Sequence, residues 1–266
     1  MTTLVSQEPA PTPHPAPTPA SPTTDRPSHV IGEIVIDRRH NGPQRSGNGG
    51  VAAGRIAEFV SGPATVVLRR PVPLARRLTV WDDGAGGVGV RVGRSLVAEA
   101  RAAGVGAVEV APPRLPSMAE ALATSINAFG FEARHPLGWC FVCSRHRRDG
   151  LGVLPGMLTQ NPDMLAAVYR PRADHGPEMV WAALDCPSYP VSAIRDGRIC
   201  VLGTQTVEQY ADLVPGSAYA VVGWTDARGT RSYRTSSALV DDAGTIVAAS
   251  NATWVALKGW AGRPRP

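Results

Sequence analysis

The sequence is poor in lysine and in aromatic residues, and it has no long apolar run. Lys258 is the only lysine, so the formal net charge of +5 rests on arginine. The arginines are dispersed along the chain, often in pairs, which is more typical of a solvated surface than of a nucleic-acid interface. Although 43% of the residues are hydrophobic, they form no window of about 18 apolar residues, so we expect no transmembrane helix.

The N-terminal segment also lacks the features of a secretory signal. No positively charged region followed by an apolar stretch is found there. We therefore expect a cytoplasmic protein whose four cysteines are reduced. Residues 1–29 are rich in Pro, Thr, Ala and Ser, which predicts a disordered tail. The alternative is a Pro-rich ligand for an adaptor protein.

Residues 30–111 have the pattern of a first folded unit. A strand is expected at Gly32–Asp37, followed by a glycine-rich turn and a helix of small residues at Val51–Val60. Turn signals then separate a series of apolar runs that favour an antiparallel meander. The strands expected after the helix are Ala64–Arg70, Leu78–Trp81, Val88–Val92 and Ser95–Ala102.

A linker at 112–149 precedes a second unit at 150–258 with the same plan. The linker carries a short predicted helix, Ser117–Ala128, which opens with a capping box. The second unit has an apolar helix from about Pro177, and residues 259–266 form a tail. Its expected strands are Gly150–Leu154, Leu165–Arg170, Arg198–Tyr210, Ala218–Asp226, Thr230–Asp241 and Thr245–Ala256.

The order of elements, a strand, a buried helix and a meander, therefore occurs twice. Aligning Asn48–Gly50 with His175–Pro177 places one carboxylate, Glu58 or Asp185, ten residues after the start of each segment. Together with the repeated order, this match indicates an internal duplication.

Asp185 is the only charged side chain in the segment Met179–Cys186. A helix that is apolar on all faces must be buried on all faces. No cationic residue lies one helical turn from Asp185, and burial without a charge partner raises the pKa of a carboxyl group, which suits a general base. The alternative is a structural Asp bonded to backbone groups that Pro187 leaves free.

Three further candidates each have a functional and a structural interpretation. Glu58 either belongs to a site or pairs with Arg55 on the same helical face. The glycines around Asn48 either let backbone amides approach a substrate oxygen or form a helix cap with Asn48 as the N-cap. His175 either contacts substrate or caps the second helix.

The pair Cys140 and Cys143, with His146 close by, is reminiscent of a zinc site. One Cys-x-x-Cys pair and one His do not make a full ligand set. Cys186 is expected in the central helix and Cys200 in a strand, so neither is expected to complete the set. We therefore expect no metal, and a structural turn that leads into the second unit.

Seven stretches spanning about residues 40–257 resemble the hotdog-fold thioesterase superfamily, and within it the actinobacterial double-hotdog thioesterase-like proteins. The resemblance implies an α+β fold, a tandem (double) hotdog in which two antiparallel sheets each wrap a central helix and form an intrachain pseudo-dimer. The matching stretches are 41–50, 64–74, 140–143, 149–151, 180–187, 221–224 and 252–254.

The resemblance also implies a catalytic arrangement. Such proteins carry His-Gly-Gly before the helix, whose amides polarise the thioester carbonyl, and an Asp or Glu about two turns in, which acts as base or nucleophile. The corresponding residues here are Asn48, Gly49 and Gly50 in the first copy and His175 in the second, with Asp185 as the carboxylate. Pro177 takes the place of the second glycine and has no N–H to donate.

The implied function is hydrolysis of an acyl thioester, in the first place acyl-CoA, with coenzyme A as part of the substrate and no other cofactor. The implied partner is a small molecule rather than nucleic acid, and two such chains could form a homodimer. The alternative is a non-catalytic acyl-thioester binding protein, whereas a hydratase would need an Asp–His pair. The remaining binding candidates are Trp181 and the strand residues Ser236, Ser237, Arg231 and Arg234.

Overall fold

The computed structural model describes residues 29–126, 128 and 137–261. Residues 1–28 of the predicted tail at 1–29, residue 127 of the predicted helix Ser117–Ala128 and residues 262–266 of the predicted tail at 259–266 lie outside this part. Within the described ranges, no helix is both long enough and apolar enough to cross a membrane.

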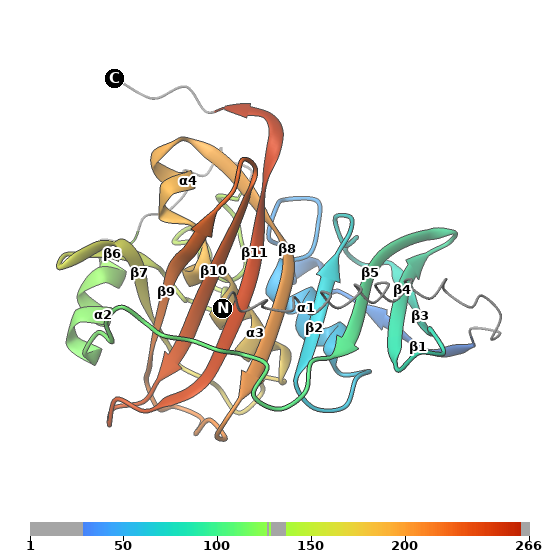
Figure 1. Ribbon diagram of the computed structural model, residues 1–266, viewed down its shortest axis with the longest axis horizontal. Helices are drawn as coiled ribbons and strands as arrows, with labels where there is room; N and C mark the ends of the chain where they lie inside the picture. The colour runs from blue at the N-terminus through green and yellow to red at the C-terminus, as the bar shows by residue number, and fades with distance from the viewer. Residues whose placement is uncertain (1–28, 127, 129–136, 262–266) are drawn as a thin grey trace, which may run out of the picture.

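One 11-stranded antiparallel sheet runs through the molecule (Figure 1). Its strand order is β1-β3-β4-β5-β2-β8-β11-β10-β9-β7-β6. The order β1-β3-β4-β5-β2 is thus followed in reverse by the corresponding strands of the second half, with β2 and β8 paired at the junction. The strands are β1 (Val30–Val35), β2 (Ala64–Leu68), β3 (Arg77–Asp82), β4 (Gly87–Val92), β5 (Ser95–Ala102), β6 (Gly156–Leu158), β7 (Asn161–Tyr169), β8 (Arg198–Gln209), β9 (Tyr219–Arg228), β10 (Ser232–Val240) and β11 (Ile246–Ala261).

Two helices, α1 (Gly49–Ala57) and α3 (Glu178–Asp185), lie side by side on one face of the sheet near this junction (Figure 1). Glycines on α1 let the two backbones approach closely. A Cβ on Gly50 would lie 2.7 Å from the Ala182 Cα, and one on Gly54 would lie 2.5 Å from the Glu178 Cα. All residues of α3 are buried, as its apolar sequence predicts.

The connection between the halves crosses the opposite face of the sheet and leads to α2 (Met118–Ile126) (Figure 1). Glu208 on β8 accepts hydrogen bonds from the backbone N–H groups of Gly106 and Val108. Asn251 on β11 donates to the Glu109 carbonyl. These contacts fix the connection on the sheet, and α2 continues over β6, β7 and β9.

Most predicted elements are found within a few residues of their expected bounds, and β5 has the expected bounds. The predicted strand Gly150–Leu154 is wrong, because the chain there is irregular and the strand β6 follows it. The helix α4 (Val191–Arg195) and the short 3₁₀ turns Arg38–His40 and Cys186–Ser188 were not predicted. The sheets of the two halves are continuous, because β2 pairs with β8, as the resemblance implies.

Candidate active site

Asp185 is the last residue of α3, and two groups from the first half of the chain hold its carboxylate. Oδ2 accepts hydrogen bonds from Nδ2 of Asn48 and from the backbone N–H of Gly50, each at 3.0 Å. Asp185 is 2% exposed. The carboxylate therefore lies at the N-terminus of α1, where the helix dipole favours a negative charge.

Asn48 has two functions at the start of α1. Its Oδ1 accepts from the backbone N–H of Val51 at 2.9 Å, which makes Asn48 the N-cap of the helix. This bond orients the side-chain amide so that Nδ2 points toward Asp185. The structural interpretation of this loop, a helix cap with Asn48 as the N-cap, is thus confirmed, and the same side chain also contacts the carboxylate of Asp185.

Burial raises the pKa of Asp185 to about 7, because removal from water penalises the charged carboxylate. The hydrogen bonds from Gly50 and Asn48 oppose this shift, and the nearby sulfur of Cys140 adds to it. The second oxygen, Oδ1, has no hydrogen-bond partner among the described residues. The carboxylate thus retains one oxygen that can accept a proton or a hydrogen bond from a ligand.

The backbone carbonyls near the end of α3 have other partners. Ser188 Oγ donates to the Asp185 carbonyl and Ser237 Oγ donates to the Leu184 carbonyl, both at 2.8 Å. Nε2 of the buried Gln205 donates to the Trp181 carbonyl at 3.2 Å. The Asp185 side chain itself accepts from Asn48 and Gly50 of the first half, and no bond from it to a backbone group near Pro187 is found among the described residues.

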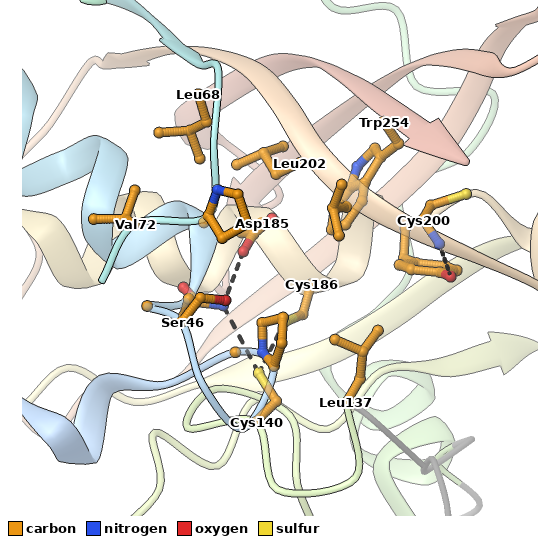
Figure 2. A pocket seen from close by; sticks show the side chains of 18 of the residues that line it. Ser46, Leu68, Val72, Leu137, Cys140, Asp185, Cys186, Cys200, Leu202 and Trp254 are labelled. Carbon is orange, nitrogen blue, oxygen red and sulfur yellow. Dashed lines mark hydrogen bonds between the residues drawn. The ribbon is translucent and has the colours of Figure 1, made fainter. Parts of the chain in front are cut away.

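A cavity of about 540 Å³ opens beside Asp185 (Figure 2). Most of its wall is apolar, and Figure 2 shows Leu68, Leu202 and Trp254 around it. Asn48, Gly49 and Asp185 are among its few polar groups. The cavity is lined by Gly42, Pro43, Arg45, Ser46, Gly47, Asn48, Gly49, Leu68, Arg69, Arg70, Pro71, Val72, Leu137, Cys140, Cys143, Pro155, Asp185, Cys186, Tyr189, Cys200, Val201, Leu202, Trp254 and Leu257.

No protein-family model and no curated protein matches this sequence. Solved structures do match. A protein of unknown function with a hot dog fold from Alicyclobacillus acidocaldarius has a TM-score of 0.57 at 14% identity, covering 86% of this chain and 95% of its own.

The chain has a hotdog fold. A thioesterase candidate from Novosphingobium aromaticivorans has a TM-score of 0.58 at 15% identity, covering 90% of this chain and 100% of its own. The tesB protein of Mycobacterium avium subs paratuberculosis has a TM-score of 0.56 at 13% identity, covering 87% of this chain and 96% of its own. The resemblance to hotdog proteins that the sequence indicated is thus confirmed for the fold.

Within this hotdog fold, His175 and Glu58 lie away from the cavity beside Asp185. His175 Nδ1 contacts the hydroxyl of Tyr169 at 3.1 Å and accepts from the backbone N–H of Arg172 at 3.2 Å. Glu58 is the C-cap of α1 and pairs with Arg55 at 3.0 Å. Burial raises the pKa of Glu58, and Arg55 opposes that shift.

Glu58 borders a second, smaller cavity of about 360 Å³, which Pro177 and Trp181 also line. The two carboxylates are not at equivalent helix positions. Asp185 is the eighth residue of α3, and the eighth residue of α1 is the buried Ile56. The matching offset of ten residues in the sequence therefore does not give two matching sites, because α3 starts after Pro177 whereas α1 starts directly after Asn48.

The remaining predicted binding residues do not line the larger cavity. Ser236 faces the connection side of the sheet, where it donates to Asp226 at 2.7 Å. Ser237 faces the helices and bonds to backbone. Arg231 donates to the Ala256 carbonyl at 2.9 Å, and Arg234 is exposed on β10.

Sequence reasoning missed the arginines of the cavity wall, Arg45, Arg69 and Arg70, and the grouping of Cys186 with Cys140 and Cys143. Cys140, Cys143 and Cys186 lie together there, and Cys200 lies elsewhere in the same wall. Cys186 directly follows α3, and its sulfur lies with those of Cys140 and Cys143. The expectation that Cys186 does not join these two cysteines is therefore wrong. The spacing of Cys140 and Cys143 was the available signal, and only the fold supplies the third sulfur.

Proposed function

We propose that this chain is a tandem hotdog protein that hydrolyses acyl thioesters. The repeated strand order and the paired helices α1 and α3 support two units, at 30–111 and 150–258, joined through β2 and β8. The single observation that carries the activity is the placement of Asp185. It comes from one half, is held by Asn48 and Gly50 of the other, and borders an apolar cavity.

The acyl chain occupies the apolar part of the cavity, and its thioester carbonyl lies at the start of α1. The N–H of Gly49 is in the first turn of α1 and has no acceptor among the described residues, so it is available to the carbonyl oxygen. Asp185 takes a proton from water as the water oxygen bonds to the carbonyl carbon. The carbon–sulfur bond then breaks as the carbonyl re-forms, and the leaving sulfur takes the proton from Asp185, which releases the carboxylic acid and the free thiol and restores the carboxylate.

The carrier that fits this cavity bears phosphate, as coenzyme A does. Arg45 and Arg70 line the cavity, both are exposed, and neither has an ion-pair partner among the described residues. Arg69 beside them pairs with Glu99. Guanidinium groups recognise phosphate by charge and by paired hydrogen bonds, so the arginines favour acyl-CoA over an uncharged thioester.

A panel of acyl-CoA substrates, assayed by release of free thiol, tests the activity. Asp185→Asn keeps the shape of the side chain and should lower kcat by about 10²–10⁴-fold, the usual contribution of a general base. The matched control is Glu58→Gln, which removes the carboxylate of the other helix and should leave kcat near that of the unmodified protein. Equal turnover in Asp185→Asn and the unmodified chain would remove Asp185 from the mechanism.

The second candidate is a non-catalytic acyl-thioester binding protein, which one specific observation favours. The Gly50 N–H and the Asn48 amide are both engaged by Asp185, so these two donors do not face a ligand. A chain that binds acyl-CoA in calorimetry but releases no thiol from any member of the panel would have this function instead.

A further inference from the structure

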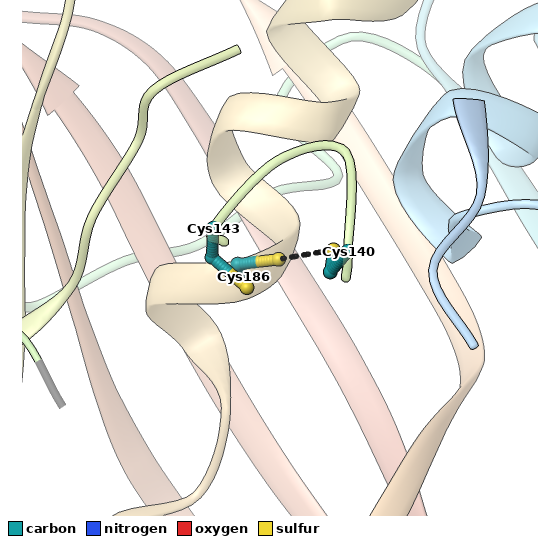
Figure 3. Close-up of side chains that lie close together, drawn as sticks. All are labelled: Cys140, Cys143 and Cys186. Atoms are coloured by element: carbon teal, nitrogen blue, oxygen red, sulfur yellow. Dashed lines mark hydrogen bonds between the residues drawn. The ribbon is translucent and has the colours of Figure 1, made fainter. Parts of the chain in front are cut away.

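Three cysteine sulfurs converge at the end of α3. The Sγ atoms of Cys140, Cys143 and Cys186 all lie within 4.8 Å of one another, and those of Cys140 and Cys186 are 3.9 Å apart. Figure 3 shows Cys140 and Cys143 on one loop turn and Cys186 facing them from the helix. Cys140 and Cys186 are buried, and Cys143 is partly buried.

The spacing of the sulfurs fits one face of a zinc tetrahedron. With Zn–S bonds of about 2.3 Å, two sulfurs of a tetrahedral site are about 3.8 Å apart. The Cys140–Cys186 separation of 3.9 Å already has this value. The longest separation, at most 4.8 Å, would need to close by about 1 Å, which a change of side-chain rotamer supplies.

Hydrogen-bond donors surround Cys140, as they do in thiolate–metal sites. Asn48 Nδ2 donates to its sulfur at 3.7 Å, and the backbone amides of Val142 and Cys143 also point at it. Donors of this kind stabilise the charge of a coordinating thiolate and fix its orientation. A buried apolar cysteine cluster would not need them.

All three cysteines also line the cavity beside Asp185. Structural zinc sites are closed by four protein ligands. A site with three protein ligands, as here, keeps its fourth position open to the cavity, as catalytic zinc sites do. The fourth ligand would come from the cavity, as a water molecule or a substrate group. A disulfide is the competing outcome, but it would join only two of the sulfurs and requires them to approach to about 2.05 Å.

We propose that Cys140, Cys143 and Cys186 bind one zinc ion through their three sulfurs, with the fourth coordination position open to the cavity. Each thiol loses its proton to solvent as its Zn–S bond forms, so binding releases protons and weakens as the pH falls. The ion joins the Cys-x-x-Cys turn to the end of α3 next to Asp185. This inference does not depend on thioester hydrolysis, since the metal is measured without substrate.

The test is metal content of the full chain. The chain is produced with zinc in the medium, dialysed against metal-free buffer and analysed by plasma mass spectrometry, and we expect one zinc per chain. Cys140→Ser, Cys143→Ser and Cys186→Ser should each weaken zinc binding by at least about 100-fold, since loss of supporting groups alone costs 10–100-fold. Cobalt(II) in place of zinc should show thiolate-to-metal absorption in the near ultraviolet, which these variants lose.

Cys200→Ser is the matched control, because Cys200 is buried, lines the same cavity and lies outside the cluster. It should keep one zinc per chain, and circular dichroism should show all four variants folded. A folded unmodified chain that retains no zinc and titrates as four free thiols would overturn the proposal. So would a zinc-free chain with two of the three sulfurs in a disulfide, or zinc retained in all three cluster variants.

Discussion

The side-chain amide of Asn48 and the carboxylate of Asp185 are 3.0 Å apart, although 137 residues separate them in the sequence. Asn48 is the N-cap of α1, and Asp185 is the last residue of α3. Because the amide caps its own helix with Oδ1, its Nδ2 has little freedom to point elsewhere. A single side chain thereby connects helix formation in the first half with the state of a buried carboxylate in the second.

Replacing Asn48 separates these two functions. Asn48→Ser keeps a good N-cap residue but is too short to reach Asp185, so the buried carboxylate loses a donor, and we expect the unfolding free energy to fall by about 1–3 kcal/mol. Asn48→Ala loses the cap as well and should be less stable by about a further 1 kcal/mol. Urea unfolding measures both values. Equal stability of the two variants would show that the cap contributes nothing.

The close approach of α1 and α3 predicts a strong effect at Gly50. Its added Cβ would lie 2.7 Å from the Ala182 Cα, the Asp185 Cβ and the Trp181 carbonyl oxygen, so the helices must move apart. We expect Gly50→Ala to destabilise the fold by about 1–3 kcal/mol and to disturb the contact to Asp185. In Gly89→Ala, the control, the nearest atom is Leu96 Cδ1 at an ordinary 3.5 Å. Similar urea midpoints for both variants would contradict the close packing.

Arg45 and Arg70 predict a preference for charged carriers. The double variant Arg45→Ala/Arg70→Ala should raise KM for acyl-CoA about 10-fold or more, since it removes two contacts to phosphate. The KM for the matching acyl-N-acetylcysteamine, which has no phosphate, should stay unchanged. Arg94→Ala, an exposed arginine that does not line the cavity, is the control. An equal rise in KM for both thioesters would indicate damage to the acyl pocket instead.

The lowered pKa of His40 predicts that protonation of this side chain reduces the stability of the fold in mild acid. Burial lowers the pKa of His40, and Arg39 and Arg147 lower it further, whereas Asp37 and Glu178 act in the opposite direction. Because His40 binds a proton at a higher pH in the unfolded chain than in the folded one, its contribution to the unfolding free energy falls as the pH decreases below about 6.5. The pKa of His175 is lowered in the same direction, again chiefly by burial. The raised pKa of Asp185 contributes in the opposite direction over this range, since the folded chain protonates that carboxylate at a higher pH than the unfolded one.

Urea unfolding at about pH 5 and about pH 7.5 measures how the two histidines change the unfolding free energy with pH. Asp185 contributes equally to the double variant His40→Gln/His175→Gln and to the unmodified chain, so the difference between them isolates the histidines. On going to the lower pH, the unfolding free energy of the double variant should change in favour of the folded state relative to that of the unmodified chain. At the higher pH both histidines are neutral in the unmodified chain, so the comparison there measures the cost of the substitutions alone. The same change in unfolding free energy between the two pH values in both proteins would exclude a contribution from these histidines.

Local patterns in the sequence predicted the elements of the fold well. Alternating apolar residues gave β5 its bounds, and the apolar segment after Pro177 indicated a fully buried helix with one carboxylate. The pattern does not say which alternate residues face the helices. The sequence therefore makes both Ser236 and Ser237 candidates, although adjacent strand residues face opposite sides of the sheet.

Long-range contacts explain what the sequence could not predict. Cys140 and Cys186 are 46 residues apart, and their contact depends on how a loop folds onto the end of α3. The partners of Asp185 are more distant still. The arginines Arg45 and Arg70 reach the cavity because the turn before α1 and the end of β2 meet there, which no local pattern encodes.

The pairing of β2 with β8 has a consequence for synthesis of the chain. The last strand, β11, inserts between β8 and β10, so the second half of the sheet closes only when the C-terminal residues have been made. Until β8 has been made, β2, with the sequence Ala64-Thr-Val-Val-Leu68, presents an uncovered apolar edge. Such an edge readily pairs with another copy of itself. A chain truncated before β8 is therefore expected to aggregate through β2 rather than persist as half a protein.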